Sequence, residues 1–287
     1  MAVTSFQTLP GDHGRRIDEC VSRQLPGLGP NGVRKVFQNR DVKLDGVRVK
    51  MDTRVYPGQT VTVYYMENLL QSRPVLQVVY EDADVLLINK AAGISVEGDD
   101  GGGVSLTSLA AQYAGHPVFP CHRLDNQTCG LILFAHHESA LHVLEDVFFR
   151  RSLDKRYVCL VRGTPKPPEC TCTAYLRKYP DQARVRVTDR EVPGSTRIIT
   201  AYETLETMEQ ISRLRVHLIT GRTHQIRAHL AALGHPILGD DVYGDRSLNR
   251  DMKTQGRLKL CSTELCLDTG GRLPALDGKH FVISPPF

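Results

Sequence analysis

The chain has 287 residues, of which 41% are hydrophobic and 24% charged, as in ordinary globular proteins. These values exclude a disordered chain, a collagen and a coiled coil, and the length favours one large domain or one large domain with a small one. No run of about 18 apolar residues is present, and residues 1–16 lack a signal peptide's apolar core. We therefore expect a cytoplasmic protein without a membrane anchor.

The first predicted unit is compact and covers residues 15–66. Apolar residues at helical spacing between Val33 and Phe37 indicate a helix with basic residues on its other faces. Alternating apolar residues flank Asp45-Gly46, which is a strong hairpin signal. A closing strand is expected at Val61-Thr-Val-Tyr-Tyr.

Positive charge gathers in this first unit. The net charge of the chain is +4, and residues 1–66 carry all of it, with ten Lys and Arg against six Asp and Glu. A small basic unit beside a neutral body suits a polyanion such as nucleic acid, although a chance fluctuation in charge would look the same. The candidate residues for binding such a polyanion are Arg34, Lys35, Arg40, Lys43 and Arg48.

The rest of the chain mixes strands and helices irregularly. Strands are predicted at 76–80, 85–89, 131–135, 157–162, about 184–187 and 213–220, and helices at 105–113, 138–151 and 223–234. Because no regular βαβ alternation appears, we expect an α+β fold with a mixed, mostly antiparallel sheet flanked by helices. The predicted domains are 1–66 and 76–287, joined by a linker at 67–75.

One segment places several polar side chains directly before a buried strand: Cys121-His-Arg-Leu-Asp-Asn-Gln-Thr-Cys-Gly130. An isolated aspartate such as Asp125 most often forms a turn. Here Arg123 and Asn126 flank Asp125, and Gly130 permits a close backbone approach. Polar residues at such a position favour a functional site.

A second segment runs from a strand through Gly221 into a helix whose first turn carries Arg222, His224, Gln225 and Arg227. Helix N-termini attract anions, and arginine binds phosphate or carboxylate. A capped surface helix with solvated charges is the alternative. A third segment begins a strand at Tyr157, which by itself suggests simple packing.

No metal site or disulfide is predicted. His224 and His229 lie about 140° apart around a helix, too far for one ion. The eight cysteines lack the paired spacing of zinc ligands, and the apolar flanks of Cys159 favour reduced thiols.

Four motifs occur in the order found in the RluA-type pseudouridine synthases, and the chain resembles that family over about residues 76–287. They are an opening motif at 79–93 that contains Lys90, His122-Arg-Leu-Asp125 with Thr128-Cys-Gly-Leu, Tyr157 with Leu160-Val-Arg-Gly163, and Gly221-Arg-Thr-His-Gln-Ile-Arg with Gly234-His-Pro-Ile-Leu-Gly-Asp240. Residues 15–66 are similar to the S-four-type RNA-binding domain that precedes some of these enzymes.

The resemblance implies an isomerase that converts uridine to pseudouridine in structured RNA, most simply large-subunit ribosomal RNA or otherwise tRNA. It implies Asp125 as the catalytic carboxylate, with Arg222 as its stabilising cation and Tyr157 as a base, proton relay or stacking group. No cofactor is needed. Further RNA contacts are implied for His122, Arg123, Thr128, His224, Gln225, Arg227 and Lys90. Arg123 would fill the space of a flipped nucleotide.

Two other classes of function are the alternatives. A non-catalytic RNA-binding protein would bind RNA without forming product. A cysteine or metal hydrolase would be inhibited by thiol reagents or chelators, but no nucleophile–base or metal-ligand spacing supports it. With no long heptads or apolar helix stripe, we expect a monomer.

Overall fold

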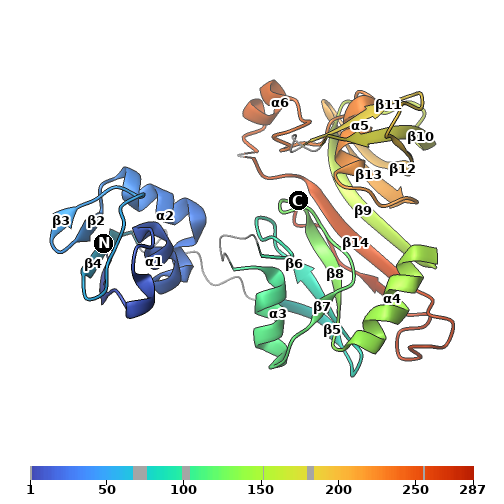
Figure 1. Cartoon of the computed structure of the whole chain (residues 1–287). Coiled ribbons are helices and arrows are strands. Elements are labelled where there is room, and N and C mark those ends of the chain that lie inside the picture. The colour runs from blue at the N-terminus through green and yellow to red at the C-terminus, as the bar shows by residue number, and fades with distance from the viewer. Residues whose placement is uncertain (1, 67–75, 99–103, 151, 180–183, 255) are drawn as a thin grey trace. The chain divides into compact units, whose positions relative to one another are not determined.

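The computed structural model describes residues 2–66, 76–98, 104–150, 152–179, 184–254 and 256–287. The chain forms two compact units, the first ending before Leu76 and the second comprising Leu76–Gly98 and Ser105–Phe287 (Figure 1). The predicted linker at 67–75 lies outside the described residues, as does most of the glycine-rich stretch that follows Gly98.

The first unit is a four-stranded sheet with strand order β1-β4-β2-β3, packed against two helices. Its elements are β1 (Ala2–Gln7), α1 (Ile17–Gln24), α2 (Gly29–Gln38), β2 (Val42–Leu44), β3 (Val47–Arg48) and β4 (Thr60–Tyr65), with short 3₁₀ turns at Pro10–Asp12 and Pro26–Leu28. The predicted helix, hairpin and closing strand are confirmed. Asp45 and Gly46 both have positive φ, as a tight two-residue hairpin turn requires.

The second unit is built on an eleven-stranded sheet with the order β11-β10-β12-β13-β9-β14-β8-β6-β5, to which β15 and β7 attach at β14 and β8. Among the described strands only β14 and β8 pair in parallel, so the predicted α+β fold with a mixed, mostly antiparallel sheet is confirmed. The strands are β5 (Gln77–Glu81), β6 (Val85–Lys90), β7 (Phe119–Pro120), β8 (Cys129–Ala135), β9 (Leu153–Arg162), β10 (Glu169–Lys178), β11 (Val185–Thr188), β12 (Thr196–Met208), β13 (Ile211–Leu218), β14 (Leu260–Leu267) and β15 (His280–Val282).

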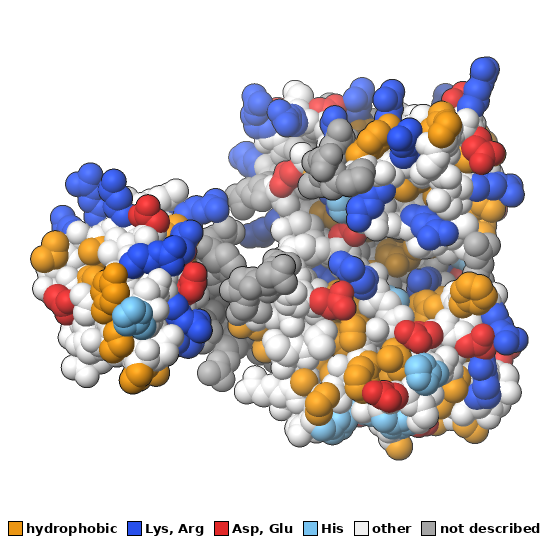
Figure 2. Space-filling view, in the orientation of Figure 1, with side chains coloured by type: hydrophobic (Ala, Val, Ile, Leu, Met, Phe, Trp, Pro, Cys, Tyr) orange, Lys and Arg blue, Asp and Glu red, His pale blue; other side chains and the backbone are white. Residues whose placement is uncertain are grey.

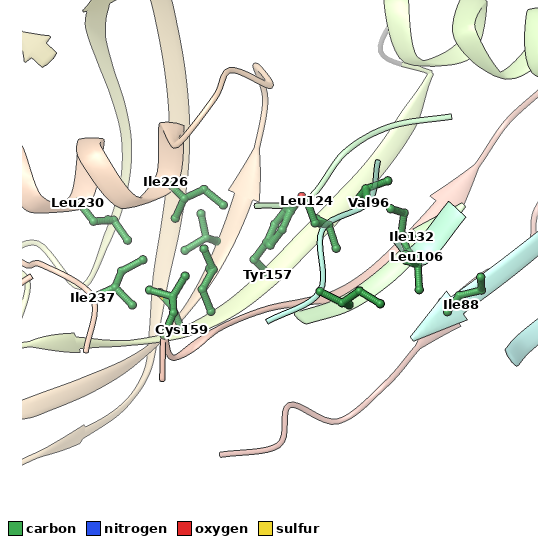
Figure 3. Packing of buried hydrophobic residues seen from close by; sticks show 14 of the residues in the cluster. Ile88, Val96, Leu106, Leu124, Ile132, Tyr157, Cys159, Ile226, Leu230 and Ile237 are labelled. Atoms are coloured by element: carbon green, nitrogen blue, oxygen red, sulfur yellow. The ribbon is translucent and has the colours of Figure 1, made fainter. Parts of the chain in front are cut away.

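Helices cover both faces of this sheet. The helices are α3 (Leu106–Ala114), α4 (Glu138–Arg150), α5 (Gln225–Ala232) and α6 (Arg246–Asp251). On one face, residues of β6 and β8 share a core with α3, and the same core continues through β9 and β13 to α5. On the other face, the alternate residues of β6 and β8 pack with α4 (Figure 1). Figure 3 shows the first of these cores, where Tyr157 lies between Leu124 and the Ile226 side of α5.

Gly130 joins the two halves of the sheet. Its φ of 108° is unfavourable for other residues, and a Cβ atom there would collide with the backbone of Ser262 on β14. The close approach expected at this glycine is therefore confirmed. It fixes the turn that carries Asp125 against the strands that carry Tyr157 and Ser262.

Candidate active site

Asp125 lies in the turn between β7 and β8, where its carbonyl oxygen accepts a hydrogen bond from the Thr128 amide at 3.0 Å. Its side chain is 23% exposed, so the carboxylate is largely enclosed but still open on one side. An enclosed carboxylate needs a compensating cation. The structure supplies that cation from α5.

Arg227 on α5 binds two carboxylates at once. Its Nη1 donates to Oδ2 of Asp125 at 2.9 Å. Its Nε and Nη2 donate to the two oxygens of Asp240 at 2.7 and 3.0 Å. The Asp240 side chain is fully buried, and its Oδ1 also accepts from the amides of Val242 and Tyr243. Asp240 therefore fixes the plane of the guanidinium so that one nitrogen points at Asp125.

The charges of Arg227, Asp125 and Asp240 stabilise one another. Burial opposes the charged form of Arg227, but its hydrogen bonds and charge contacts with Asp240 and Asp125 outweigh burial and raise the pKa of the guanidinium. Burial likewise opposes ionisation of Asp240, but the Arg227 hydrogen bonds and the two amides bring the pKa of that carboxyl below its usual value. Arg227 is a permanent cation beside Asp125.

The prediction that Arg222 pairs with Asp125 needs correction, because Arg227 occupies that place. His224 adopts a left-handed backbone conformation with a φ of 54°, so α5 begins only at Gln225. Arg222 thus precedes the helix with an exposed side chain, while Arg227 sits in its first turn and faces the sheet. Nothing in the sequence predicts the left-handed backbone conformation of His224.

His224 completes the polar side of the site. Its Nε2 lies 3.8 Å from Oδ2 of Asp125, and its Nδ1 lies 3.0 Å from the Tyr243 hydroxyl. Burial lowers the pKa of His224 despite the nearby Asp125 charge, so the ring is neutral near pH 7. Neither Tyr243 nor Asp240 was predicted to have a role. The sequence feature that could have indicated a role for Asp240 is its position at the end of the motif Gly234-His-Pro-Ile-Leu-Gly-Asp240.

Tyr157 begins the buried part of β9 with only 5% of its surface exposed. Burial raises the pKa of its phenol well above the ordinary value, although a hydrogen bond with Ser262 opposes this effect. The Asp125 charge acts on the same phenol and favours the neutral form. Tyr157 is therefore a neutral phenol next to the carboxylate.

Lys90 was predicted to contact RNA, but the structure places it inside the fold. The ammonium group donates to the carbonyls of Ala91, Ile94 and Asn126 at 3.1, 2.8 and 2.9 Å. Burial lowers its pKa to about 8. Lys90 ties the strand end at β6 to the turn that carries Asp125, so it positions that turn and cannot reach a phosphate.

Three other predicted RNA contacts need the same correction. Thr128 and Gln225 are buried, and Gln225 bonds Thr200, Thr220 and the Ile199 carbonyl, which anchors the start of α5. The ring of His122 faces α4, 4.9 Å from the Phe148 ring. Arg123, by contrast, is 78% exposed and lies 3.6 Å from Glu97.

His122 makes a testable contribution to acid sensitivity. Its Nε2 accepts from the Leu133 amide at 3.2 Å and its Nδ1 is buried, and burial lowers its pKa from 6.5 to about 3. Between these values only the unfolded chain takes up the proton, so stability is lost as the pH falls. From pH 7 to 4.5 this group should cost roughly 2–3 kcal/mol of unfolding free energy.

Urea unfolding followed by circular dichroism at both pH values checks this expectation. A His122→Gln variant, whose amide oxygen can replace Nε2, should lose correspondingly less stability than the original chain. Equal losses in the two proteins would show that His122 does not titrate in this way.

Comparison with known proteins places the chain in a family. Residues 84–232 match the family model described as RNA pseudouridylate synthase. The chain is 34% identical to an uncharacterized RNA pseudouridine synthase of Mycobacterium bovis, over 100% of this chain and 95% of the relative. It is 32% identical to the ribosomal large subunit pseudouridine synthase C of Vibrio parahaemolyticus, over 81% of this chain and 78% of the relative.

The chain therefore belongs to the RNA pseudouridine synthase family, as the motif resemblance predicted, and is an isomerase that acts on RNA. Among solved structures, human RNA pseudouridylate synthase domain containing 4 matches with a TM-score of 0.59 and 25% identity, covering 73% of this chain and 88% of that one. Within the described part of the chain, no helix is both long and apolar enough to span a bilayer.

Proposed function

We propose that this protein isomerises a specific uridine of large-subunit ribosomal RNA in the cytoplasm, with Asp125 as the catalytic carboxylate. The observation that carries the proposal is the asymmetric setting of this group. Oδ2 is held by Arg227 at 2.9 Å, whereas Oδ1 has no hydrogen bond to any described residue. One oxygen is anchored and the other is available to a substrate.

Such a carboxylate suits the chemistry of the reaction. Uracil is detached from its ribose, turned, and rejoined through C5, and the proton on C5 is then lost. An ionised carboxylate can attack the substrate or accept a proton without any cofactor. Arg227 stabilises the ionised form in a site that is mostly shielded from water.

Tyr157 supports this chemistry as a neutral phenol. Its raised pKa disfavours a phenolate base, so we favour stacking on the uracil ring or hydrogen bonding over direct proton abstraction. A tyrosine ring buried beside the carboxylate offers a flat apolar surface for a base.

The target base must leave its stack to reach Asp125, at a cost of a few kcal/mol. Arg123 is exposed two residues from Asp125 and is the candidate to fill the vacated space. Phosphate contacts from the basic side chains of the first unit would offset that cost. They are exposed or half-exposed on α2, β2 and β3 and in the turn after α2: Arg34, Lys35, Arg40, Lys43 and Arg48.

Substrate choice follows the relatives. The Vibrio parahaemolyticus protein is named for the ribosomal large subunit, and it matches 81% of this chain. We therefore place ribosomal RNA ahead of tRNA as the target class.

The test is tritium release from RNA labelled at C5 of uridine, because joining uracil through C5 frees that hydrogen to water. Large-subunit ribosomal RNA from cells lacking the gene should release tritium with the purified protein, and a tRNA mixture should release much less. Release from tRNA alone would reverse the substrate assignment. RNA binding without release from either pool would favour a non-catalytic binding protein.

A further inference from the structure

One face of the sheet in the second unit points away from α5 and carries charged side chains. On β10 and β12, Ala174, Leu176 and Ile198 pack with Ala228 of α5. Because side chains alternate along a strand, Tyr175, Arg177 and Arg197 project from the opposite face. We call that opposite side the outer face.

Most of the outer face is electrically balanced. Arg213 lies 3.7 Å from Glu206, and Arg215 lies 3.1 Å from Glu203. Arg156 on β9 lies 2.9 Å from Asp154. Cross-strand pairs of opposite charge are the usual way to cover an exposed sheet.

The end of the outer face at β10, β11 and β12 breaks this pattern. Arg177 and Arg186 are direct cross-strand partners, and Arg197 is the partner of Tyr175. Among the described residues, none of these three arginines has an ion pair with a carboxylate. This holds although the acidic residues Asp189 and Glu191 follow Arg186 closely in the sequence. Like charges placed directly opposite each other destabilise a sheet. The arrangement is explained if an external anion compensates it.

Aromatic rings accompany these charges. The Arg177 guanidinium lies 4.8 Å from the centre of the Tyr179 ring, and the half-buried Tyr175 lies between the partner positions Thr188 and Arg197. Arginine interleaved with tyrosine is typical of surfaces that hold RNA, since arginine binds phosphate and rings stack on bases. Figure 2 shows several Lys and Arg side chains, together with acidic and hydrophobic ones, over the region where Figure 1 labels β10 and β11.

This end of the sheet is attached to the site through hydrogen bonds. The Val185 amide on β11 donates to the Tyr243 hydroxyl at 2.8 Å, and that hydroxyl contacts Nδ1 of His224 at 3.0 Å. His224 in turn lies 3.8 Å from Asp125. The β11 edge, beyond which the outer face begins, therefore lies next to the site.

We propose that Arg177, Arg186 and Arg197, together with Tyr175, form a docking surface for the phosphate backbone of the RNA that flanks the target uridine. The identification of that RNA as the substrate rests on the proposed function. The surface adds affinity that does not depend on base sequence, because its contacts are to phosphates.

The test compares two triple variants with equal changes in charge. Arg177→Gln, Arg186→Gln and Arg197→Gln are combined in one, and Arg156→Gln, Arg213→Gln and Arg215→Gln in the other, whose arginines are already paired. Binding of a fluorescein-labelled RNA hairpin with a uridine in its loop is measured from 50 to 300 mM KCl. Thermal melting confirms that each variant is folded.

The first variant should bind roughly ten-fold more weakly at 100 mM KCl, and the slope of log Kd against log salt should fall by about 2–3 for three lost contacts. The second should stay close to the original protein. An unchanged salt slope in the first variant, or equal losses of affinity in both variants, would refute the proposed docking surface. Because binding is measured without turnover, a protein that bound RNA through these arginines but formed no pseudouridine would refute only the proposed function.

Discussion

Replacing Asp125 with asparagine is expected to abolish pseudouridine formation while leaving the fold and RNA binding intact. Asparagine keeps the shape of the side chain, and its carbonyl oxygen can still accept from Nη1 of Arg227. It cannot act as an anionic nucleophile or take up a proton. Loss of a covalent or proton-accepting group typically lowers turnover by at least roughly four orders of magnitude.

Tritium release under single-turnover conditions, with enzyme in excess so that all of the RNA is bound, measures this loss separately from affinity. Asp84→Asn is the matched control, since Asp84 is a carboxylate in the turn between β5 and β6 that contacts only His137 among the described side chains. The control should retain the original rate. Residual turnover in Asp125→Asn within ten-fold of that rate would remove Asp125 from the catalytic role.

Local patterns predicted much of the fold. The Asp45-Gly46 hairpin needs two residues that tolerate positive φ, and the sequence shows both. Helix α4 was predicted from its apolar spacing and ends at Arg150, within one residue of the expected position. Such features depend on neighbours along the chain, which is why they can be read without the structure.

Among the strands that were not predicted, the two longest are β10 and β12. β10 alternates Cys and Ala with Thr and Tyr, so its two faces differ little in polarity. β12 contains a register shift between Thr204 and Glu206 that interrupts its alternation. These strands become stable by pairing with each other. Because the paired residues are far apart in the sequence, local patterns do not predict the pairing.

The cation beside Asp125 is Arg227 and not the predicted Arg222. Motifs brought Asp125 and the segment 221–227 together as one site, as the resemblance implied. Which arginine faces the carboxylate depends on where α5 begins, and one left-handed residue at His224 decides that. The partner of Arg227 on its far side is Asp240, thirteen residues away, and although a motif ends at Asp240, its pairing with Arg227 is visible only in three dimensions.

Asp240 is expected to matter for both stability and activity. Asp240→Asn leaves Arg227 as a buried cation with its main partner gone, and breaking a buried pair in this way costs about 3–5 kcal/mol. The same change releases the guanidinium from the plane that directs it at Asp125, so turnover should fall as well. The matched control is Asp154→Asn, which breaks a pair with Arg156 on the exposed outer face and should cost at most about 1 kcal/mol.

Combining Asp240→Asn with Arg227→Met separates the two effects. The double variant removes both buried charges, and uncharged replacements for a buried pair are often close to neutral in stability. We expect urea unfolding to show that much of the stability lost in Asp240→Asn is regained, since the introduced asparagine can still accept from the amides of Val242 and Tyr243. Tritium release should remain lost, because Asp125 then has no cation. If turnover returned together with stability, Arg227 would serve the fold alone and the charge argument for Asp125 would be wrong.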